Sequence, residues 1–340
     1  MIRAWTEHPA RTGTRQQVPL DFVSPGDDGA TRLSTSVALW HYAPESTPAP
    51  ADPARSPSRS PRLLFIHGFR GDHHGMALIV DALPDYEIFV PDLPGFGATA
   101  PLRRNSGGRA EHTLQVYAAS VEALAQQLGL GDDDVLVGHS FGSIIVAAHA
   151  AAGPVTGPVT GPVTGAGTAS RRWRGLALFA PISNDIFTGR LLPGAAGVDA
   201  YYRLTRRLPE RWAEAVLRAP IAQAVTNRSM IVAREPEVID YIRDQHRQHF
   251  SGYADPQTLL QAYWASSRHT VTEFAPALQL PVLLVPGAQD QLSTPAGQRA
   301  LRDLLPQGHA EVLRDTGHLL HYEKPAPAAR ALRRFLLSLD

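Results

Sequence analysis

Short apolar runs and longer amphipathic segments alternate along most of this chain. The runs end in turn residues and are dense in Val, Ile, Leu and Phe, without an alternation of apolar and polar positions. They lie at residues 63–67, 88–90, 135–137, 176–179, 282–285 and 311–313. Such runs predict strands that are buried on both faces, as in a parallel sheet covered by helices. Residues 36–42 instead alternate apolar and polar positions, which predicts a more exposed edge strand.

Helical spacing fills the intervals between these strands. Apolar residues recur every three or four positions through residues 113–128, and Gly129 ends the pattern. A second helix is expected at 328–339, after Pro325 and Pro327. Strands that alternate with helices predict an α/β fold with a mostly parallel, doubly wound sheet.

Residues 183–270 lose the strand pattern and are helical in character. Helices are expected there at 201–208, 210–217, 236–249 and 256–268. We therefore predict an α/β core formed by residues 1–182 and 271–340, with residues 183–270 inserted as a helical cap, or lid.

Two other segments interrupt the alternation of strands and helices. Residues 43–61 are rich in Pro, Ser and Ala and predict a surface loop. Residues 153–164 are three copies of Gly-Pro-Val-Thr. A proline in every four residues excludes both a helix and a central strand, so we expect a surface insertion.

The composition is that of a globular protein with no strong charge. Of the 340 residues, 44% are hydrophobic and 19% are charged, and Lys+Arg and Asp+Glu both number 32. A net charge of zero gives no general attraction to nucleic acid or to an anionic membrane. The chain has no cysteine, which excludes disulfides, thiolate metal sites and cysteine nucleophiles. No apolar stretch is long enough for a secretory signal or a membrane span, so we expect a soluble, cytoplasmic protein whose oligomeric state the sequence leaves open.

The clearest chemical motif is Gly138-His139-Ser140-Phe141-Gly142, between the strand at 135–137 and a helical run at 143–152. A serine on a sharp strand-to-helix turn projects its hydroxyl from the edge of the sheet. The turn crowds the backbone, so small residues are needed on both sides of the serine. The following helix also offers free N–H groups and a positive dipole end to a developing anion. Ser140 is therefore the expected nucleophile.

Four motifs in order resemble those of the α/β-hydrolase fold family, over roughly residues 62–339. Residues 65–71 (Phe-Ile-His-Gly-Phe-Arg-Gly) resemble the family's oxyanion loop, and residues 91–97 (Pro-Asp-Leu-Pro-Gly-Phe-Gly) its next conserved turn. The serine motif is the third. Gly287-Ala-Gln-Asp290 and Thr316-Gly-His318 together resemble the acid and histidine loops. The order Ser, Asp, His is the order of this fold.

Acyl-transfer chemistry assigns a role to each candidate residue. A serine hydroxyl needs a neighbouring imidazole to take its proton, and His318 is the expected base. Asp290 can hold that imidazole in one tautomer and stabilise its protonated form. The oxyanion of the tetrahedral intermediate needs two donors, and the backbone N–H groups of Phe69 and Phe141 are the candidates. This mechanism needs no cofactor.

Other interpretations of these residues stay open. Asp290 could instead cap the helix expected near residue 295, and Asp185 is a rival acid because it follows the strand at 176–179. His318 could be a structural loop histidine. Asp72-His73-His74 superficially suggests a metal site. Adjacent histidines on one loop seldom converge on one ion, however, and no third ligand stands at a recognisable spacing, so we expect no metal.

A serine nucleophile argues against the dehalogenase and epoxide-hydrolase branches of the family, which use a carboxylate. Residues 68–72 (Gly-Phe-Arg-Gly-Asp) differ from the Gly-Pro-Gly loop typical of carbon–carbon bond hydrolases, and the region has no run of three glycines as in tertiary-alcohol esterases. We therefore expect a carboxylic ester hydrolase that acts on a small to medium acyl substrate. The alternatives are an amide or lactone hydrolase, an acyltransferase, a perhydrolase, a carbon–carbon bond hydrolase or a non-enzymatic binding protein on the same fold.

Overall fold

A nine-stranded sheet forms the centre of the chain in the computed structural model, which describes residues 8–26, 29–45, 60–152 and 173–339. The strand order is β1-β2-β4-β3-β6-β7-β8-β9, with the short β5 paired to β2. The strands are β1 (Thr14–Gly26), β2 (Gly29–Tyr42), β3 (Leu63–Ile66), β4 (Ile88–Pro91), β5 (Arg103–Arg104), β6 (Val135–His139), β7 (Gly175–Phe179), β8 (Val282–Val285) and β9 (Gly308–Ala310). The Gly-Pro-Val-Thr copies and most of the 43–61 loop lie outside the described residues.

Six neighbouring strands of the sheet, β4, β3, β6, β7, β8 and β9, run parallel, as the unbroken apolar runs predict. Every residue of β3, β4, β6, β7 and β8 is buried. The pairs β4–β3, β3–β6, β6–β7, β7–β8 and β8–β9 are parallel, and the pairs β1–β2, β2–β4 and β2–β5 are antiparallel. The mostly parallel, doubly wound sheet is therefore confirmed. Because the parallel strands all end at one edge, the loops that follow them meet there.

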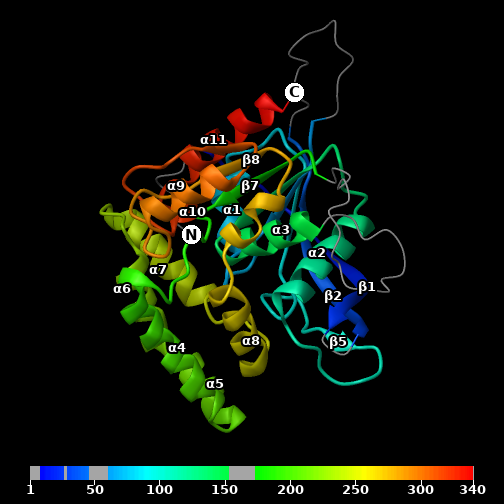
Figure 1. Cartoon of the computed structure of the whole chain (residues 1–340), viewed down its shortest axis with the longest axis vertical. Coiled ribbons are helices and arrows are strands. Elements are labelled where there is room, and N and C mark those ends of the chain that lie inside the picture. Colours follow the sequence, from blue (N-terminus) through cyan, green and yellow to red (C-terminus); the bar gives the residue numbers. More distant parts are fainter. Residues whose placement is uncertain (1–7, 27–28, 46–59, 153–172, 340) are drawn as a thin grey trace, which may run out of the picture.

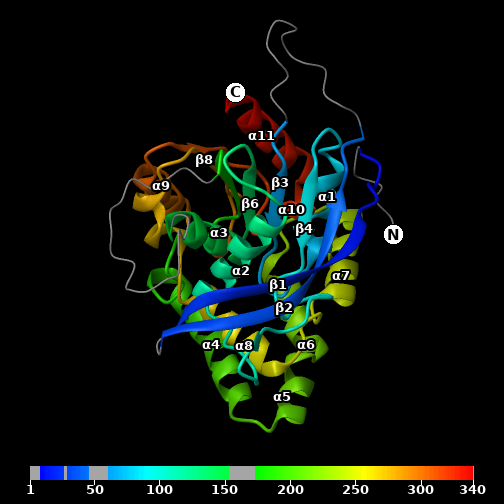
Figure 2. The same cartoon turned by 90° about the vertical axis from the view of Figure 1, so that its right-hand side faces the viewer.

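Two strand expectations are wrong in detail. The strand expected at 36–42 is the second half of β2, and β2 is not an edge strand because β1 pairs with it along its whole length (Figure 2). In β1, Val18, Leu20 and Phe22 are buried and alternate with exposed residues, the pattern of a strand with one buried face. The strand expected at 311–313 lies earlier, as β9. Only Leu313 of that run makes a bridge, to Gly287.

Helices cover both faces of the sheet. One hydrophobic core joins α2 and α3 to the sheet, and a second core, on the other face, joins α1, α10 and α11 to it. The helices outside the segment between β7 and β8 are α1 (Ala77–Asp81), α2 (Leu114–Gln127), α3 (Phe141–Ala152), α9 (Pro295–Leu304), α10 (Leu320–Glu323) and α11 (Pro325–Ser338). The helix expected at 113–128 begins one residue later, because the Thr113 side chain accepts a hydrogen bond from the Val116 N–H and serves as the N-cap.

Between β7 and β8 lie five helices, among which α4, α5 and α8 extend away from the sheet at the end opposite α11 (Figure 1). They are α4 (Leu192–Arg206), α5 (Glu210–Leu217), α6 (Pro220–Met230), α7 (Pro236–His249) and α8 (Pro256–Ser267). The sequence pattern did not predict α6, since none of its residues is buried and no apolar face marks it. Within the described residues, no helix has the length and hydrophobicity to cross a membrane.

Candidate active site

The turn between β6 and α3 carries Ser140 at the carboxyl edge of the sheet. Ser140 has a φ of 53°, in the left-handed region that non-glycine residues rarely adopt. The neighbouring glycines are required by close backbone contact. A Cβ on Gly138 would lie 2.5 Å from the Gly142 carbonyl oxygen, and one on Gly142 would lie 2.1 Å from the Ile66 carbonyl oxygen. The two glycines therefore let α3 start directly against β3, and the strained serine points out of the turn.

Asp290 and His318 reach Ser140 from the loops that follow β8 and β9. The Nε2 atom of His318 lies 2.7 Å from Ser140 Oγ, within hydrogen-bond distance. The other ring nitrogen, Nδ1, lies 3.1 Å and 3.2 Å from the two carboxylate oxygens of Asp290. The Asp290 carboxylate is fully buried, while Ser140 is half-buried. With the proton on Nδ1 donated to Asp290, Nε2 is free to accept the serine proton.

Neither alternative for the acidic residues holds in the structure: Asp290 does not cap helix α9, and Asp185 does not contact His318. The side chain of Thr294, not Asp290, caps helix α9. Asp290 Oδ1 instead accepts hydrogen bonds from the backbone N–H groups of Leu292 and Ser293, at 2.8 Å and 3.1 Å. Asp185 bonds the backbone N–H of Phe187 in its own loop. Of the two carboxylates, Asp290 is therefore the one beside the imidazole.

The loop after β3 lies directly against the serine turn. A Cβ on Gly68 would lie 3.1 Å from Ser140 Cβ. His67 braces this loop: its Nε2 accepts the Leu93 N–H at 2.9 Å, so its Nδ1 carries the proton and donates to the Gly68 carbonyl at 2.8 Å. Burial lowers the pKa of His67, which favours this neutral form. The loop that carries Phe69 is thus fixed between the serine turn and the loop after β4.

Phe69 and Phe141, the two expected oxyanion donors, directly follow Gly68 and Ser140, which lie against each other. Phe141 is buried and opens helix α3, where the first N–H groups have no partner within the helix. The half-buried Phe69 ring contacts Phe96, Tyr202 and Tyr263, with ring centroids 6.2–6.3 Å apart. The aromatic cluster therefore packs the Phe69 side chain against the inserted helices, and its backbone stays beside the serine.

Sequence comparison agrees with this arrangement of loops. Residues 61–325 match the family model described as the alpha/beta hydrolase fold. The chain belongs to the α/β-hydrolase fold family.

Among curated proteins, Lipase 3 of Moraxella sp. (strain TA144) is 24% identical over 276 residues, which cover 80% of this chain and 76% of that protein. The monoacylglycerol lipase abhd6-B of Xenopus laevis is 23% identical over 292 residues, 84% of this chain and 77% of that protein. Among solved structures, a thermophilic esterase from Thermogutta terrifontis has a TM-score of 0.65 and 22% identity, covering 95% of this chain and 99% of that one. At this identity the structural likeness establishes the fold.

In this α/β-hydrolase, two residues that the sequence analysis did not single out hold the histidine loop. Glu323 Oε2 accepts hydrogen bonds from the Thr316 hydroxyl and the Gly317 N–H, while its Oε1 accepts the N–H groups of residues 232 and 233. Gln291 Oε1 accepts the His318 N–H at 3.1 Å, and its Nε2 donates to the carbonyl of Met230. The loop that carries His318 is thus tied to the segment between α6 and α7. The signal available in the sequence was a glutamate five residues after the candidate histidine.

His139 connects the serine turn to the histidine loop. It is buried, and its Nε2 lies 3.3 Å from the His318 carbonyl oxygen. Burial, together with the nearby His318, lowers the pKa of His139 from 6.5 to about 3. His139 is therefore neutral at physiological pH and donates its Nε2 proton to that carbonyl, which adds no charge beside the proposed base.

The structure brings a third group to the Asp72-His73-His74 segment. His249, at the end of α7, places its Nδ1 3.2 Å from Asp72 Oδ2, and His74 Nδ1 lies 3.0 Å from Asp72 Oδ1. Asp72, His74 and His249 have the residue types of a metal site. The His74 and His249 rings, however, are stacked 3.8 Å apart at 25°. A metal in the plane of one ring would lie well out of the plane of the other, so this arrangement suits a carboxylate that binds two imidazole N–H groups. The absence of a metal stays a prediction.

The hydrogen bonds at Asp72 decide its ionisation. Burial alone would raise the pKa of the carboxyl group, but the hydrogen bonds from His249 and His74 outweigh burial and hold the pKa well below its usual range. Asp72 is therefore a carboxylate at neutral pH, and it joins the end of α7 to the loop that carries Phe69.

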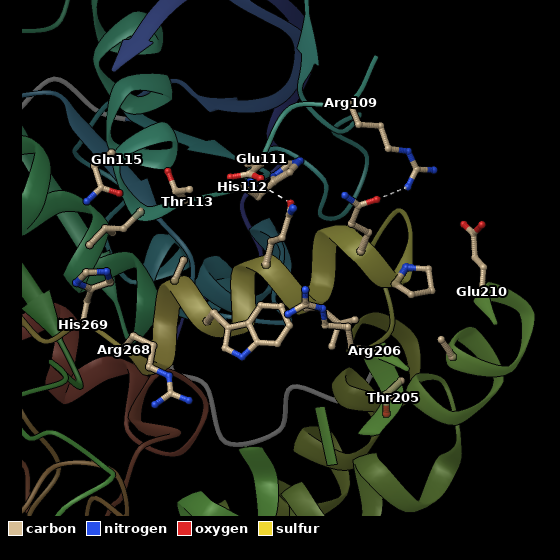
Figure 3. Close-up of a pocket in the computed structure, with 18 of the residues that line it drawn as sticks. Arg109, Glu111, His112, Thr113, Gln115, Thr205, Arg206, Glu210, Arg268 and His269 are labelled. Atoms are coloured by element: carbon tan, nitrogen blue, oxygen red, sulfur yellow. Dashed lines mark hydrogen bonds between the residues drawn. The ribbon is translucent and has the colours of Figure 1, made fainter. Parts of the chain in front are cut away.

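A cavity of about 810 Å³ lies elsewhere, between the start of α2 and the helices α4, α5 and α8 (Figure 3). Leu260, Trp264 and Arg268, on one face of α8, line it. Tyr263 is not among its lining residues and instead contacts Phe69. None of Ser140, Asp290 and His318 lines this cavity. This cavity is thus separate from the candidate catalytic groups.

Proposed function

We propose that this protein is a serine hydrolase that cleaves carboxylic ester bonds through an acyl-enzyme on Ser140. The observation that carries the proposal is the continuous hydrogen-bonded chain from the Ser140 hydroxyl through the His318 imidazole to the Asp290 carboxylate. A hydroxyl so placed can lose its proton to the imidazole as it attacks a carbonyl carbon. The strained turn supports the same role, because it projects the hydroxyl out of the turn although the left-handed conformation at Ser140 lowers the stability of the fold.

The proposed reaction has two halves that use the same groups. Ser140 Oγ attacks the carbonyl carbon while His318 Nε2 takes its proton, and the oxyanion is bound by the N–H groups of Phe69 and Phe141. His318 then gives the proton to the leaving alcohol, and the acyl group stays on Ser140. Water, deprotonated by His318, attacks the acyl carbon, and His318 returns that proton to Ser140 Oγ as the ester bond to the serine breaks and the acid leaves. Asp290 stabilises the imidazolium that forms in each half.

Ester cleavage is favoured over other acyl chemistry by the relatives. The two curated relatives described above are named as lipases, and the solved structure described above is named as an esterase. We also propose that residues 183–270 act as the cap over the site. Tyr202 on α4 and Tyr263 on α8 contact Phe69, which is consistent with a cap that shapes the substrate pocket.

The Ser140→Ala variant tests the proposal. We expect wild-type protein to hydrolyse p-nitrophenyl acetate or butyrate and to be labelled by a fluorophosphonate probe, and we expect Ser140→Ala to lose both reactions. Ser143→Ala is the matched control, because the Ser143 hydroxyl donates to the Ser140 carbonyl and does not contact His318. Survival of most activity in Ser140→Ala would remove the nucleophile assignment. Absence of any labelling in the wild type would favour a binding protein, and product analysis with added alcohol would detect an acyltransferase.

A further inference from the structure

Arg70 occupies a position that suits glycine. It lies between Phe69 and Gly71 in the loop after β3, and its φ is 58°, in the left-handed region. This conformation is unfavourable for an L-residue, because its Cβ comes too close to the following carbonyl oxygen. The Gly71 N–H donates to the Gly68 carbonyl at 3.1 Å, so Arg70 is inside a closed turn. An arginine in this conformation indicates that its side chain makes interactions that offset the strain.

Those interactions all reach the inserted helices. The Arg70 Nε donates to the Tyr202 hydroxyl on α4 at 3.0 Å. Its two terminal nitrogens donate to the Leu217 carbonyl, at the C-terminal end of α5, at 3.3 Å and 3.4 Å. A helix end carries unpaired carbonyls and a partial negative charge, and a guanidinium complements both. One side chain of the Phe69 loop thus holds two helices of the proposed cap.

The Arg70 guanidinium is buried and lacks an acidic partner. Arg70 is 6% exposed, and among the described residues no carboxylate forms an ion pair with it. Its charge instead lies against three aromatic rings, with centroids at 4.6 Å for Phe250, 5.6 Å for Tyr253 and 5.8 Å for Tyr202. A cation against several ring faces is stabilised only while the rings surround it. If the cap moved away, Arg70 would lose nearly all of its partners together.

A second contact ties the same loop to the same part of the cap. Asp72 follows Arg70 by two residues and binds His249, which directly precedes Phe250. The Gly97 N–H donates to the Gly252 carbonyl at 2.6 Å, next to both contacts. The loop between α7 and α8 is therefore docked on the residues that follow Phe69 in the chain.

We propose that Arg70 is a positioning residue that makes the geometry of the oxyanion loop depend on the docking of the cap. This proposal rests on the proposed function, since it assigns the Phe69 N–H to the oxyanion. While the guanidinium is held by Tyr202 and Leu217, the peptide between Phe69 and Arg70 is fixed in its turn. When these partners leave, the strained left-handed conformation at Arg70 loses its support and the loop relaxes. The oxyanion hole is then complete only with the cap in place, which limits acyl transfer to the closed, substrate-covered state.

Three variants separate coupling from simple loss of stability. Arg70→Met keeps the length of the side chain and removes the charge and the donors. Tyr202→Phe removes one acceptor of Arg70 and keeps the ring beside Phe69. Arg218→Met is the matched control: Arg218 lies 4.5 Å from the Tyr253 ring and donates to the carbonyls of Ser251 and Tyr253, but it belongs to the cap and does not touch the Phe69 loop.

For Arg70→Met we expect kcat with p-nitrophenyl butyrate to fall about 10- to 100-fold, with KM changed much less, because a donor displaced by about an ångström loses transition-state binding. Tyr202→Phe should lower kcat less, and the double variant Arg70→Met/Tyr202→Phe should be no slower than Arg70→Met alone, since both remove one interaction. Arg218→Met should leave kcat within about twofold. Wild-type kcat in Arg70→Met, or an equal loss in Arg218→Met, would overturn the proposal. Should Arg70→Met not fold, Tyr202→Phe carries the test, and kcat within twofold of wild type would count against coupling.

Hydrogen exchange provides a readout that does not need a substrate. In Arg70→Met, the backbone amides of residues 68–71 and of 250–253 should both exchange faster than in wild type. In Arg218→Met, only residues 250–253 should do so. Unchanged exchange at 68–71 in Arg70→Met would refute the coupling even if the protein hydrolyses esters. Conversely, a wild-type protein that is inert to esters and to the fluorophosphonate would refute the proposed function, while the exchange data would still decide the coupling.

Discussion

Replacement of Asp290 by asparagine reverses the hydrogen bonding of the proposed base, and the surrounding backbone determines how. Oδ1 of Asp290 accepts two backbone N–H groups, from Leu292 and Ser293. In Asp290→Asn the amide oxygen must take this place, because an NH2 group there would face two donors. The NH2 group then faces Nδ1 of His318, which lies 3.1 Å from Oδ2 in the wild type.

An NH2 group opposite Nδ1 forces His318 into the other tautomer. Nδ1 must then accept, so Nε2 carries the proton and points it at the Ser140 hydroxyl, 2.7 Å away. A protonated Nε2 cannot take the serine proton. We expect kcat to fall about 10⁴-fold, which is the loss typical of a triad with the wrong tautomer and corresponds to ~5.5 kcal/mol of transition-state stabilisation.

The assay is steady-state hydrolysis of p-nitrophenyl butyrate, with thermal unfolding measured in parallel to show that the variant is folded. Asp185→Asn is the control, since Asp185 bonds only within its own loop in the described structure and should keep activity within about twofold. More than a tenth of wild-type kcat in Asp290→Asn would refute the tautomer argument. A larger loss in Asp185→Asn than in Asp290→Asn would move the acid to the loop after β7.

Two further predictions concern packing and pH. In Gly142→Ala the new Cβ would lie 2.1 Å from the Ile66 carbonyl oxygen, so α3 must shift away from β3. Activity should fall at least 100-fold, and the melting temperature should drop. The control is Gly197→Ala, in open space on α4, which should not destabilise the fold. Equal effects would contradict the packing argument. Burial lowers the pKa of His112 and His246 from 6.5 to about 4. The unfolded chain therefore binds more protons than the folded chain between pH 6.5 and 4. As the pH is lowered through this window, the free energy of unfolding should decrease by on the order of 1 kcal/mol per pH unit for each histidine. Urea titration at several pH values measures this decrease. Constant stability from pH 7 to 4.5 would be inconsistent with these neutral histidines.

Much of the fold was predictable because local pattern and final environment agree. The strand Val282–Val285 and the helices Glu210–Leu217 and Pro236–His249 have the bounds that their apolar spacing predicts. Ser140 could also be recognised from the sequence, because glycines two residues away on each side are a local requirement of a crowded turn. β1 was missed although its alternation is plain, and α6 was missed because an exposed helix leaves no apolar stripe.

The sequence by itself determined which residues could act, and only the tertiary structure decided which of them meet. Asp185 and Asp290 each follow a strand, and the sequence favours Asp290 with Asp185 as a rival, but only the structure shows that Asp290 is the one of the two beside His318. The Arg70 guanidinium is surrounded by Tyr202, the Leu217 carbonyl, Phe250 and Tyr253. The last of these lies 183 positions further along the chain. Side-chain periodicity reports only which face of its own element a residue occupies. Contacts between loops depend on how whole elements pack, because burial of the two hydrophobic cores sets the distances between loops far apart in the sequence.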